Sequence, residues 1–494
     1  MTGMAAAAAA GTDFLSLDVR GVPRGRLTEE LVRRVRAALA EQRLVPGDVL
    51  PPTRVLAADL GVSRGVVVEV YRRLADEGLV AARTGSGTRV LPGARTAPAP
   101  AGPPESPNSP NPVPAFPVEP AFLPLRAAGA RFDLSPGAPD LSAFPRAAWL
   151  RAERAVLRDA PAADLGYGDP RGHPRLRAEL AGWLARTRGM RVDAGDVLVV
   201  TGVAQSLALL AQVLRARGTA RIGVEDPGSR GARDELARWG LHPEPVPVDA
   251  DGVRVDALAA GGAGAVLLTP AHQFPTGVVL APRRRRELLA WAREGGGLVV
   301  EDDYDAEHRY DRAPVPALHA SAPGHVAHTS STSKTLAPGA RTGWLVAPRA
   351  LREDLVAAKH SADLGNPALP QLVLAALIAA GDLERHVRRV RARQRTRRDA
   401  LLAALRRHLP GARVQGVAAG LHLLVLLPHL DPGADVEVAV RAAAAGVVLH
   451  PLSWHRVRPG VPGLVLGYAA TAPDGFDEAV RRLAPLVPLV PGPR

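Results

Sequence analysis

Lysine is almost absent from this chain of 494 residues, and the two lysines that remain are candidates for chemistry that arginine cannot perform. Of the 62 basic residues 60 are arginine, and the lysines are Lys334 and Lys359. A GC-rich genome explains this bias, under which arginine serves wherever only a positive charge is needed. Arginine stays protonated, whereas the surroundings can deprotonate a lysine amine and let it form a Schiff base. The persistence of Lys334 therefore points to such a role.

Small hydroxyl side chains and an arginine accompany Lys334 in the sequence HTSSTSKTLAPGARTGWLV. Ser331 and Ser333 precede the lysine, and Arg341 follows it. Hydroxyl groups suit a phosphate, and an arginine can hold one through two parallel hydrogen bonds. A loop rich in serine and threonine is usually only a loop, so this stretch gains meaning from the residues that the fold brings near it.

Four short apolar runs predict the buried parallel strands that would position these residues. The runs are Val197–Val200, Arg221–Val224, Ala265–Leu268 and Leu298–Val300. In doubly wound sheets the ligand lies at the carboxyl ends of the strands. Polar or glycine-rich residues follow each run directly, as such a site requires. Gly202, Val203 and Ala204 follow the first run, and Asp302 and Tyr304 follow the last.

These groups together meet the needs of a site for pyridoxal 5′-phosphate (PLP). Lys334 provides the amine for a Schiff base, and Asp302 can keep the pyridine nitrogen protonated. Tyr304 can donate a hydrogen bond to the 3′-oxygen. The backbone N–H groups of Gly202–Ala204, between a strand and a helix, can bind the phosphate. The sequence EDDYDAEHRY could instead be a solvated turn or an acidic metal site, but its single histidine and the lack of a third ligand argue against metal.

Residues 20–90 predict a separate small unit of three helices and a hairpin. A short second helix is expected at 53–60, and Ser63 can cap the third helix. Two short strands around Gly85 and Gly87 predict a wing. In the first helix an apolar residue recurs at every fourth position: Leu27, Leu31, Val35 and Leu39.

Two helices joined at a glycine turn and followed by a basic hairpin indicate a winged helix-turn-helix. Its third helix would enter the major groove of DNA with Ser63 and Arg64 at the leading end. From Arg20 to Val90 there are 13 arginines against 8 acidic residues, a balance that favours contact with phosphates. The same pattern also fits a helical docking module whose basic face is only solvated.

Composition divides the chain into three segments. Residues 20–91 form the predicted winged helix-turn-helix domain, and residues 92–131 form a linker dominated by Pro, Ala, Ser and Asn. Residues 132–490 form an α/β domain with a mostly parallel sheet and helices on both faces. A smaller α/β part is expected at its C-terminal end, beginning at about Gln371.

The overall composition limits the classes of protein that remain. The absence of cysteine excludes disulfides and thiolate metal sites. No stretch approaches the roughly 20 apolar residues of a membrane span, and Ala5–Ala10 lacks the basic start of a signal peptide. We therefore expect a cytoplasmic protein with no membrane partner. The net charge of +13 favours acidic partners such as nucleic acid.

The N-terminal segment closely resembles the GntR-type winged helix. The matching sequence is LVPGDVLPPTRVLAADLGVSRGVVVEVYRRLADEGLVAARTGSGTRV, which shares the proline pair, the PPTR arginine, the LGVSR turn and the GSGT wing. The resemblance implies that DNA is contacted by Arg54, Ser63 and Arg64. It also implies that the wing tip is formed by Gly85, Gly87 and Thr88.

The rest of the chain resembles a fold-type-I aminotransferase domain, and the whole chain resembles the MocR/GabR subfamily of GntR-type regulators, which fuse the two parts. The matching motifs are GYGDPRGHPRLRAELAGWL, TGVAQSLALL, VEDPGSRGAR, TPAHQFPTG, VEDDYDAEHRY and STSKTLAPGARTGWL. The resemblance implies that Lys334 carries PLP, that Asp302 faces its pyridine nitrogen and that Tyr304 faces its 3′-oxygen. The phosphate would be bound by Ser331, Ser333 and Arg341.

The resemblance also adds two residues to the expected PLP site. His272 lies in a loop that relatives place beside the ring. Tyr167 resembles the tyrosine that fold-type-I enzymes extend to the phosphate of the partner chain, which implies an obligate homodimer.

The chain departs from the pattern of these families at three places. Gly65–Val66 starts the reading helix, where glycine is a poor helix former, so the base preference stays open. Ser229 stands where relatives carry a tyrosine, and Val465 stands where they often carry an arginine. The residue that would bind an effector carboxylate is therefore unassigned, and its candidates are Arg230, Arg456 and Arg458.

The sequence predicts a PLP-dependent transcription regulator that binds double-stranded operator DNA as a homodimer. It would sense a small amine, an amino acid or PLP itself, through formation of an external aldimine. The alternative is a PLP-dependent aminotransferase with an accessory DNA-binding module, and a PLP-storage protein has no positive support. The intact winged helix and the long linker favour the regulator, whereas the set of Lys334, Asp302 and Tyr304 serves both functions.

Overall fold

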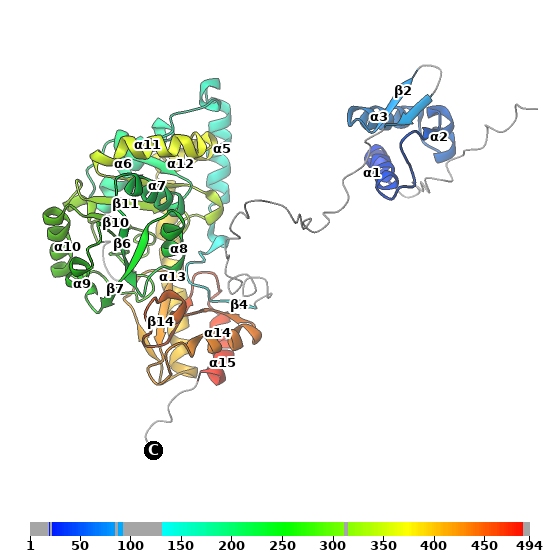
Figure 1. The fold of residues 1–494 in the computed structure, drawn as a ribbon. Helices are drawn as coiled ribbons and strands as arrows, with labels where there is room; N and C mark the ends of the chain where they lie inside the picture. Colours follow the sequence, from blue (N-terminus) through cyan, green and yellow to red (C-terminus); the bar gives the residue numbers. More distant parts are fainter. Residues whose placement is uncertain (1–18, 20–21, 84–86, 92–130, 311–314, 488–494) are drawn as a thin grey trace, which may run out of the picture. The chain divides into compact units, whose positions relative to one another are not determined.

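The computed structural model describes residues 19, 22–83, 87–91, 131–310 and 315–487, and it divides the chain into two compact units, Met1–Phe116 and Pro117–Arg494 (Figure 1). The boundary falls inside the predicted linker. Most of that linker, the wing-tip residue Gly85 and residues 488–490 lie outside the described residues. The domain limits inferred from the sequence therefore stay predictions.

The described residues of the N-terminal unit form three α-helices and a small antiparallel sheet. Its elements are α1 (Leu27–Ala40), β1 (Val49–Leu50), α2 (Thr53–Leu60), α3 (Arg64–Asp76), β2 (Val80–Arg83) and β3 (Gly87–Val90). The apolar faces of α1, α2 and α3 meet in one core, which buries Leu31, Leu56 and Val67. The predicted helices are therefore present, and the core is the one that their apolar spacing predicts.

The hairpin has a third strand that the sequence did not reveal. β1 pairs with β3, so the order of the sheet is β1-β3-β2. β1 contains only two residues, and so short a strand leaves no alternating pattern to detect.

The junction between α2 and α3 has the expected turn but not the expected cap. Gly61 ends α2 in the left-handed conformation, with φ at 63°, which glycine adopts without strain. Ser63 occupies the N-cap position of α3, but its side chain makes no capping hydrogen bond. The exposed Ser63 hydroxyl therefore stays available at the end of the helix that we expect to meet DNA.

An eight-stranded sheet forms the centre of the C-terminal unit. Its strands are β5 (Val197–Val200), β6 (Arg221–Asp226), β7 (His242–Asp249), β8 (Gly252–Val253), β9 (Ala265–Leu268), β10 (Leu298–Asp302), β11 (Val326–Ser331) and β12 (Gly343–Val346). They lie in the order β5-β12-β11-β10-β9-β6-β7-β8. The central strands β11, β10, β9, β6 and β7 run parallel, whereas β12 and β8 run antiparallel to their neighbours. The four predicted strands are all among them, and two extend two residues further, to Asp226 and Asp302.

Helices cover both faces of this sheet, because successive side chains of a strand point to opposite sides. Val300 packs with apolar residues of α7, α8 and α11, whereas its neighbour Val299 packs with those of α9 and α10. The α-helices of this part of the chain are α5 (Arg146–Asp159), α6 (Pro174–Arg188), α7 (Val203–Ala216), α8 (Arg230–Arg238), α9 (Val255–Gly261), α10 (Pro282–Gly295), α11 (Arg349–Asp363), α12 (Ala368–Ala379) and α13 (Asp382–His408), of which α5 packs on α12. None of the described helices is both long and apolar enough to cross a membrane.

A smaller antiparallel sheet comes after α13 in the chain. Its order is β13-β14-β17-β16, formed by β13 (Arg413–Gln415), β14 (His422–Leu426), β16 (His450–Pro451) and β17 (Gly463–Gly467). A parallel pair joins β15 (Val447–Val448) to β4 (Phe132–Asp133), and the helices are α14 (Asp435–Ala444) and α15 (Gly475–Leu483). The start predicted near Gln371 is too early, because Gln371 is buried in α12, which packs against α5 and α6.

Candidate functional site

A cavity of about 390 Å³ lies at the carboxyl ends of β5, β10 and β11. It collects nine of the eleven residues that the sequence nominated for the cofactor. They are Gly202, Val203, Ala204, Asp302, Tyr304, Ser331, Ser333, Lys334 and Arg341. His272 and Tyr167 do not line it.

The turn between β5 and α7 prepares one end of the cavity for an anion. Gly202 has a φ of 131°, a conformation that favours glycine. A Cβ atom at this position would lie 3.4 Å from the guanidinium of Arg341, so the two groups are in close proximity. The guanidinium of Arg341 therefore lies close to the backbone N–H groups at the start of α7. Such a combination of helix N–H groups and a positive charge is typical of phosphate-binding sites.

Lys334 lies in the turn after β11, and its amine reaches into the same cavity. Its Nζ donates a hydrogen bond of 2.6 Å to the carbonyl oxygen of Gly137. Gly137 has a φ of 81°, and a Cβ there would lie only 3.1 Å from Nζ. A side chain at position 137 would therefore crowd the amine that the sequence singles out.

Asp302 is the last residue of β10, and its carboxyl group, which lines the cavity, has a raised pKa. Burial raises the pKa of its carboxyl to about 7, and the nearby Asp303 and Asp305 add to the shift. Its Oδ1 atom is buried and has no hydrogen-bond partner among the described residues. Buried polar atoms without partners are rare in proteins, so this oxygen is suited to an N–H group that a ligand would bring.

Tyr304 contacts His272, which lies outside the wall of the cavity. The Nδ1 atom of His272 lies 3.1 Å from the Tyr304 hydroxyl and 2.8 Å from an oxygen of Asp305. Burial raises the pKa of Tyr304 well above its usual value, with Asp305 contributing, so the phenol stays protonated and can donate. Gly420 makes room for the imidazole, because a Cβ there would overlap its ring. His272 thus lies behind the tyrosine and not in the wall of the cavity.

Two aromatic residues that sequence reasoning missed complete the cavity wall. Phe274 and His422 both line it, and their ring centres lie 5.1 Å apart. Burial lowers the pKa of His422 to about 3, so the ring is neutral at physiological pH. Phe274 belongs to the TPAHQFPTG motif, which was a usable signal. His422 comes from β14 in the smaller sheet, which no strand-end pattern of the larger sheet could indicate.

The candidate arginines for an effector carboxylate do not line the cavity: Arg230, Arg456 and Arg458. Val465 is fully buried against Leu424 and Leu452. Ser229 lines the cavity and also caps α8 by accepting a hydrogen bond from the N–H of Ala232. In the described part of the chain, the charged groups of the wall are Lys334, Arg341, Asp302 and Glu235.

Lys359 is a further residue to which the sequence assigned no role. Its side chain is 0% exposed on α11, and its Nζ donates to both carboxylate oxygens of Asp363, at 2.8 and 2.7 Å. Asp363 also accepts from the side-chain amide of Gln205, which lies in the first turn of α7. A signal was present in the sequence, because Lys359 is one of only two lysines in the chain.

Tyr167 lies on the surface of its own chain, with 93% of its area exposed. It lines a different depression of about 610 Å³ together with Leu165 and Leu364, which are also exposed. Its role toward a partner chain therefore stays a prediction.

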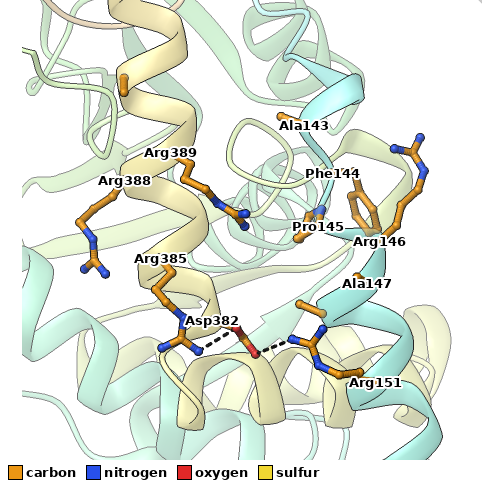
Figure 2. Close-up of a pocket in the computed structure, with 12 residues that line it drawn as sticks. Ala143, Phe144, Pro145, Arg146, Ala147, Arg151, Asp382, Arg385, Arg388 and Arg389 are labelled. Carbon is orange, nitrogen blue, oxygen red and sulfur yellow. Dashed lines mark hydrogen bonds and ion pairs between the residues drawn. The ribbon is translucent and has the colours of Figure 1, made fainter.

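A still larger cavity, of about 770 Å³, lies between α5 and the first half of α13 (Figure 2). Its charged residues are mainly arginines, and Asp382 connects two of them, Arg385 and Arg151. Figure 2 shows that Arg388 extends away from the Pro145 side of this cavity. None of the described residues that line it is a lysine or a histidine, and none of them was expected at the cofactor site.

In the N-terminal unit, Arg54 and Arg64 are exposed, and their side chains make no ion pair or hydrogen bond with the described residues. Neighbouring arginines differ, because Arg72 and Arg73 both pair with Glu69 on α3. Gly87 and Thr88 begin β3, beside the undescribed residues that include Gly85. The guanidinium groups of Arg54 and Arg64 are thus available for the DNA contact that the sequence predicts.

Comparison with known proteins divides the chain in the same way. Residues 27–90 match the model of the gntR family of bacterial regulatory proteins, and residues 132–483 match that of the class I and II aminotransferases. The HTH-type pyridoxine biosynthesis transcriptional regulator PdxR of Corynebacterium glutamicum is 33% identical over 93% of this chain and 96% of its own. The probable rhizopine catabolism regulatory protein MocR of Rhizobium meliloti is 32% identical over 92% of both chains.

Solved structures resemble the C-terminal unit. An archaeal alanine:glyoxylate aminotransferase superposes with a TM-score of 0.68 at 26% identity, over 74% of this chain and 93% of that one. The α-aminoadipate aminotransferase LysN of Thermus thermophilus, solved with N-(5′-phosphopyridoxyl)-L-leucine, superposes with a TM-score of 0.66 at 28% identity, over 74% of this chain and 94% of that one.

Proposed function

This chain belongs to the MocR-type transcriptional regulators, in which a gntR-family domain precedes a class I and II aminotransferase domain, and we propose that it binds PLP at Lys334 and regulates transcription in response to a small ligand. The aminotransferase fold family depends on PLP. The cofactor, the DNA target and the effector of this chain are the parts of the proposal that experiments must test.

The unpartnered Oδ1 of Asp302, in the same cavity as the Lys334 amine, is the observation that carries the PLP assignment. PLP supplies an aldehyde that condenses with primary amines and a protonated pyridine ring that withdraws electrons. Asp302 would accept the ring N–H, and its carboxylate form would become favoured because a cation then lies beside it. Tyr304 would donate to the 3′-oxygen, while His272 holds the phenol in place.

The other end of the cavity fits the phosphate. The N–H groups of Gly202–Ala204 begin α7, and Arg341 lies against Gly202. Ser331 and Ser333 line the cavity from the turn that carries Lys334. These donors would bind the phosphate and so fix the position of the aldehyde relative to the amine.

We propose two candidate effectors for this cavity. A small primary amine would compete with Lys334 for the aldehyde, which would release the lysine amine and so allow its hydrogen bond to Gly137. PLP itself is the second candidate, because a relative over most of the chain is named for the control of pyridoxine biosynthesis. An aminotransferase with an accessory DNA-binding domain remains the alternative function.

Genome-wide mapping of the DNA bound by this protein tests the regulator directly. The proposal expects a small number of discrete sites next to genes, and their functions would indicate the effector. Uniform background across the genome, with a folded and PLP-loaded protein, would favour the aminotransferase.

Arg64→Ala should weaken binding to a specific operator by about 1–3 kcal/mol if the side chain reads a base. If Arg64 holds a phosphate, the loss should be similar for all DNA sequences and the salt dependence should decrease. Electrophoretic mobility shifts at several salt concentrations measure both effects. Arg26→Ala is a matched control, because Arg26 is exposed but precedes α1 and not the reading helix. Equal losses in the two variants would contradict the assignment of Arg64.

Tyr167→Phe should weaken the retention of PLP without lowering the stability of the subunit, because Tyr167 is almost fully exposed in its own chain. We propose that its hydroxyl reaches the phosphate in the partner chain of a homodimer. Dilution of the wild-type protein should accordingly release PLP and monomer together, as followed by sedimentation with detection at the PLP band. A monomer that keeps its full PLP content would refute the homodimeric site.

A further inference from the structure

The amine of Lys359 lies outside the cavity, yet hydrogen bonds connect it to the turn where we place the phosphate. The side chain is completely buried on α11, which packs against α7. A buried ammonium group is costly unless it is paired, and both oxygens of Asp363 pair with it. An N–H donated by Gly365 at 2.9 Å further fixes the Asp363 carboxylate.

Asp363 determines in turn how the side chain of Gln205 is oriented. The Nε2 group of Gln205 donates to Asp363 over 2.7 Å, which leaves Oε1 as the atom that faces the other way. That Oε1 accepts the backbone N–H of Thr201 at 2.9 Å. An amide has one donor end and one acceptor end, so the carboxylate and the backbone together allow only one orientation.

Thr201 is the residue directly before Gly202, at the start of the turn that leads into α7. The N–H of Thr201 is thus tied to the side chain of Gln205 one helical turn later. This bond closes the loop that bears the N–H groups of Gly202–Ala204. The conformation of the loop therefore depends on a chain of hydrogen bonds that begins at Lys359.

We infer that Lys359 is a positioning residue for the phosphate of the cofactor, acting through Asp363 and Gln205 on the loop before α7. The inference rests on the proposed function, because it assumes that the phosphate binds at this loop. It also explains why a lysine persists at a second position in a chain that otherwise uses arginine. The side chain is closed to solvent on all sides, and a compact ammonium group fits where a planar guanidinium requires more room.

The test compares the affinity for PLP with that for pyridoxal, which has the same ring and aldehyde but no phosphate. Full-length wild-type protein, Lys359→Met and Gln205→Leu are freed of cofactor and titrated with each compound, and binding is followed by absorbance. Both variants should bind PLP roughly ten-fold or more weakly, as expected when a hydrogen bond to a charged group is misaligned. Their affinity for pyridoxal should equal that of the wild type.

Gln394→Leu provides the matched control. Gln394 is also fully buried, lies on α13, and has no partner for either side-chain atom among the described residues. This variant should keep the wild-type ratio of the two affinities, and thermal melting should show that all the proteins are folded. The Gln205→Leu variant leaves the pair of Lys359 and Asp363 intact, so it tests the connection even if Lys359→Met fails to fold.

Equal weakening of PLP and pyridoxal binding would overturn the inference, because it would indicate a general structural role. An unchanged PLP affinity in Gln205→Leu would overturn it as well. A wild-type protein that binds neither compound would instead refute the proposed function itself, so the two failures are distinguishable.

Discussion

Lys334→Ala should remove the long-wavelength absorption band of the PLP-loaded protein completely. A C=N bond conjugated with the ring absorbs at longer wavelength than the free aldehyde, and Lys334 is the lysine whose amine lies in the cavity. Asp302, Tyr304 and Arg341 remain in this variant, so PLP should still bind weakly and without the band. The effect is a full loss and not a shift, because none of the other described residues of the wall is a lysine.

Reduction with borohydride followed by peptide mapping provides the second readout. In the wild type the reduced cofactor should be found on the peptide that contains Lys334. A band that survives in Lys334→Ala, with the cofactor attached to Lys359, would show that the site is assigned wrongly. The buried position of Lys359 makes that result unexpected.

Asp302→Asn should weaken PLP binding and, at the same time, stabilise the cofactor-free protein at high pH. Replacing the charged acceptor of this hydrogen bond with a neutral one costs up to about 1.5–3 kcal/mol, which corresponds to a roughly ten- to hundred-fold weaker affinity for PLP. Asparagine keeps the shape of the side chain and an acceptor oxygen, so the change isolates the effect of the charge.

Asp302→Asn should weaken PLP binding but raise the free energy of unfolding of the cofactor-free protein, because the pKa of Asp302 is raised in the folded state. Its pKa is about 7 in the folded chain, against 3.8 for an ordinary aspartate, so the folded protein holds this proton more tightly. Asp302 therefore lowers the free energy of unfolding as the pH rises from 3.8 to about 7. At pH 8 the cost is at most about 4 kcal/mol, and Asp302→Asn should recover part of it.

Thermal unfolding of the two cofactor-free proteins between pH 5 and pH 8 measures this difference. The advantage of Asp302→Asn should increase with pH and level off above about 7. Comparison with the wild type cancels the contributions of other buried carboxyl groups, such as Glu225 and Glu307. A difference in unfolding temperature that is constant over this pH range, or that decreases with pH, would contradict the raised pKa of Asp302.

Local patterns were sufficient for much of the fold. The runs at Val197–Val200 and Ala265–Leu268 correspond to β5 and β9 without change, because strands buried on both faces are continuously apolar. Asp302 and Gly202 lie far apart in the sequence, but each follows a strand, so a shared cavity at the carboxyl ends of the strands could be predicted. Parallel strands place their carboxyl ends at one edge whatever the distance along the chain.

Tertiary contacts determined what the sequence could not reveal. His422 lines the cavity because it lies on β14 of the smaller sheet, which pairs with β17. No local sequence pattern indicates that this strand lies near the cavity. Lys359 became informative only when its burial and its contact with Asp363 were known. The resemblance predicts that His272 lies beside the ring, whereas its contact with Tyr304 depends on the space that Gly420 leaves.

We propose that ligand chemistry at Lys334 is coupled to DNA binding. The most direct test follows the absorption spectrum, the amount of product and the operator affinity in one sample, while amines are screened in the presence of a keto-acid acceptor. We expect one class of ligand to shift the spectrum and to change operator affinity by about 1–3 kcal/mol with little product, since coupling equals the difference in ligand affinity between two states. Repeated turnover at roughly 1 per second or faster, with unchanged operator affinity, would contradict the claim and identify an aminotransferase.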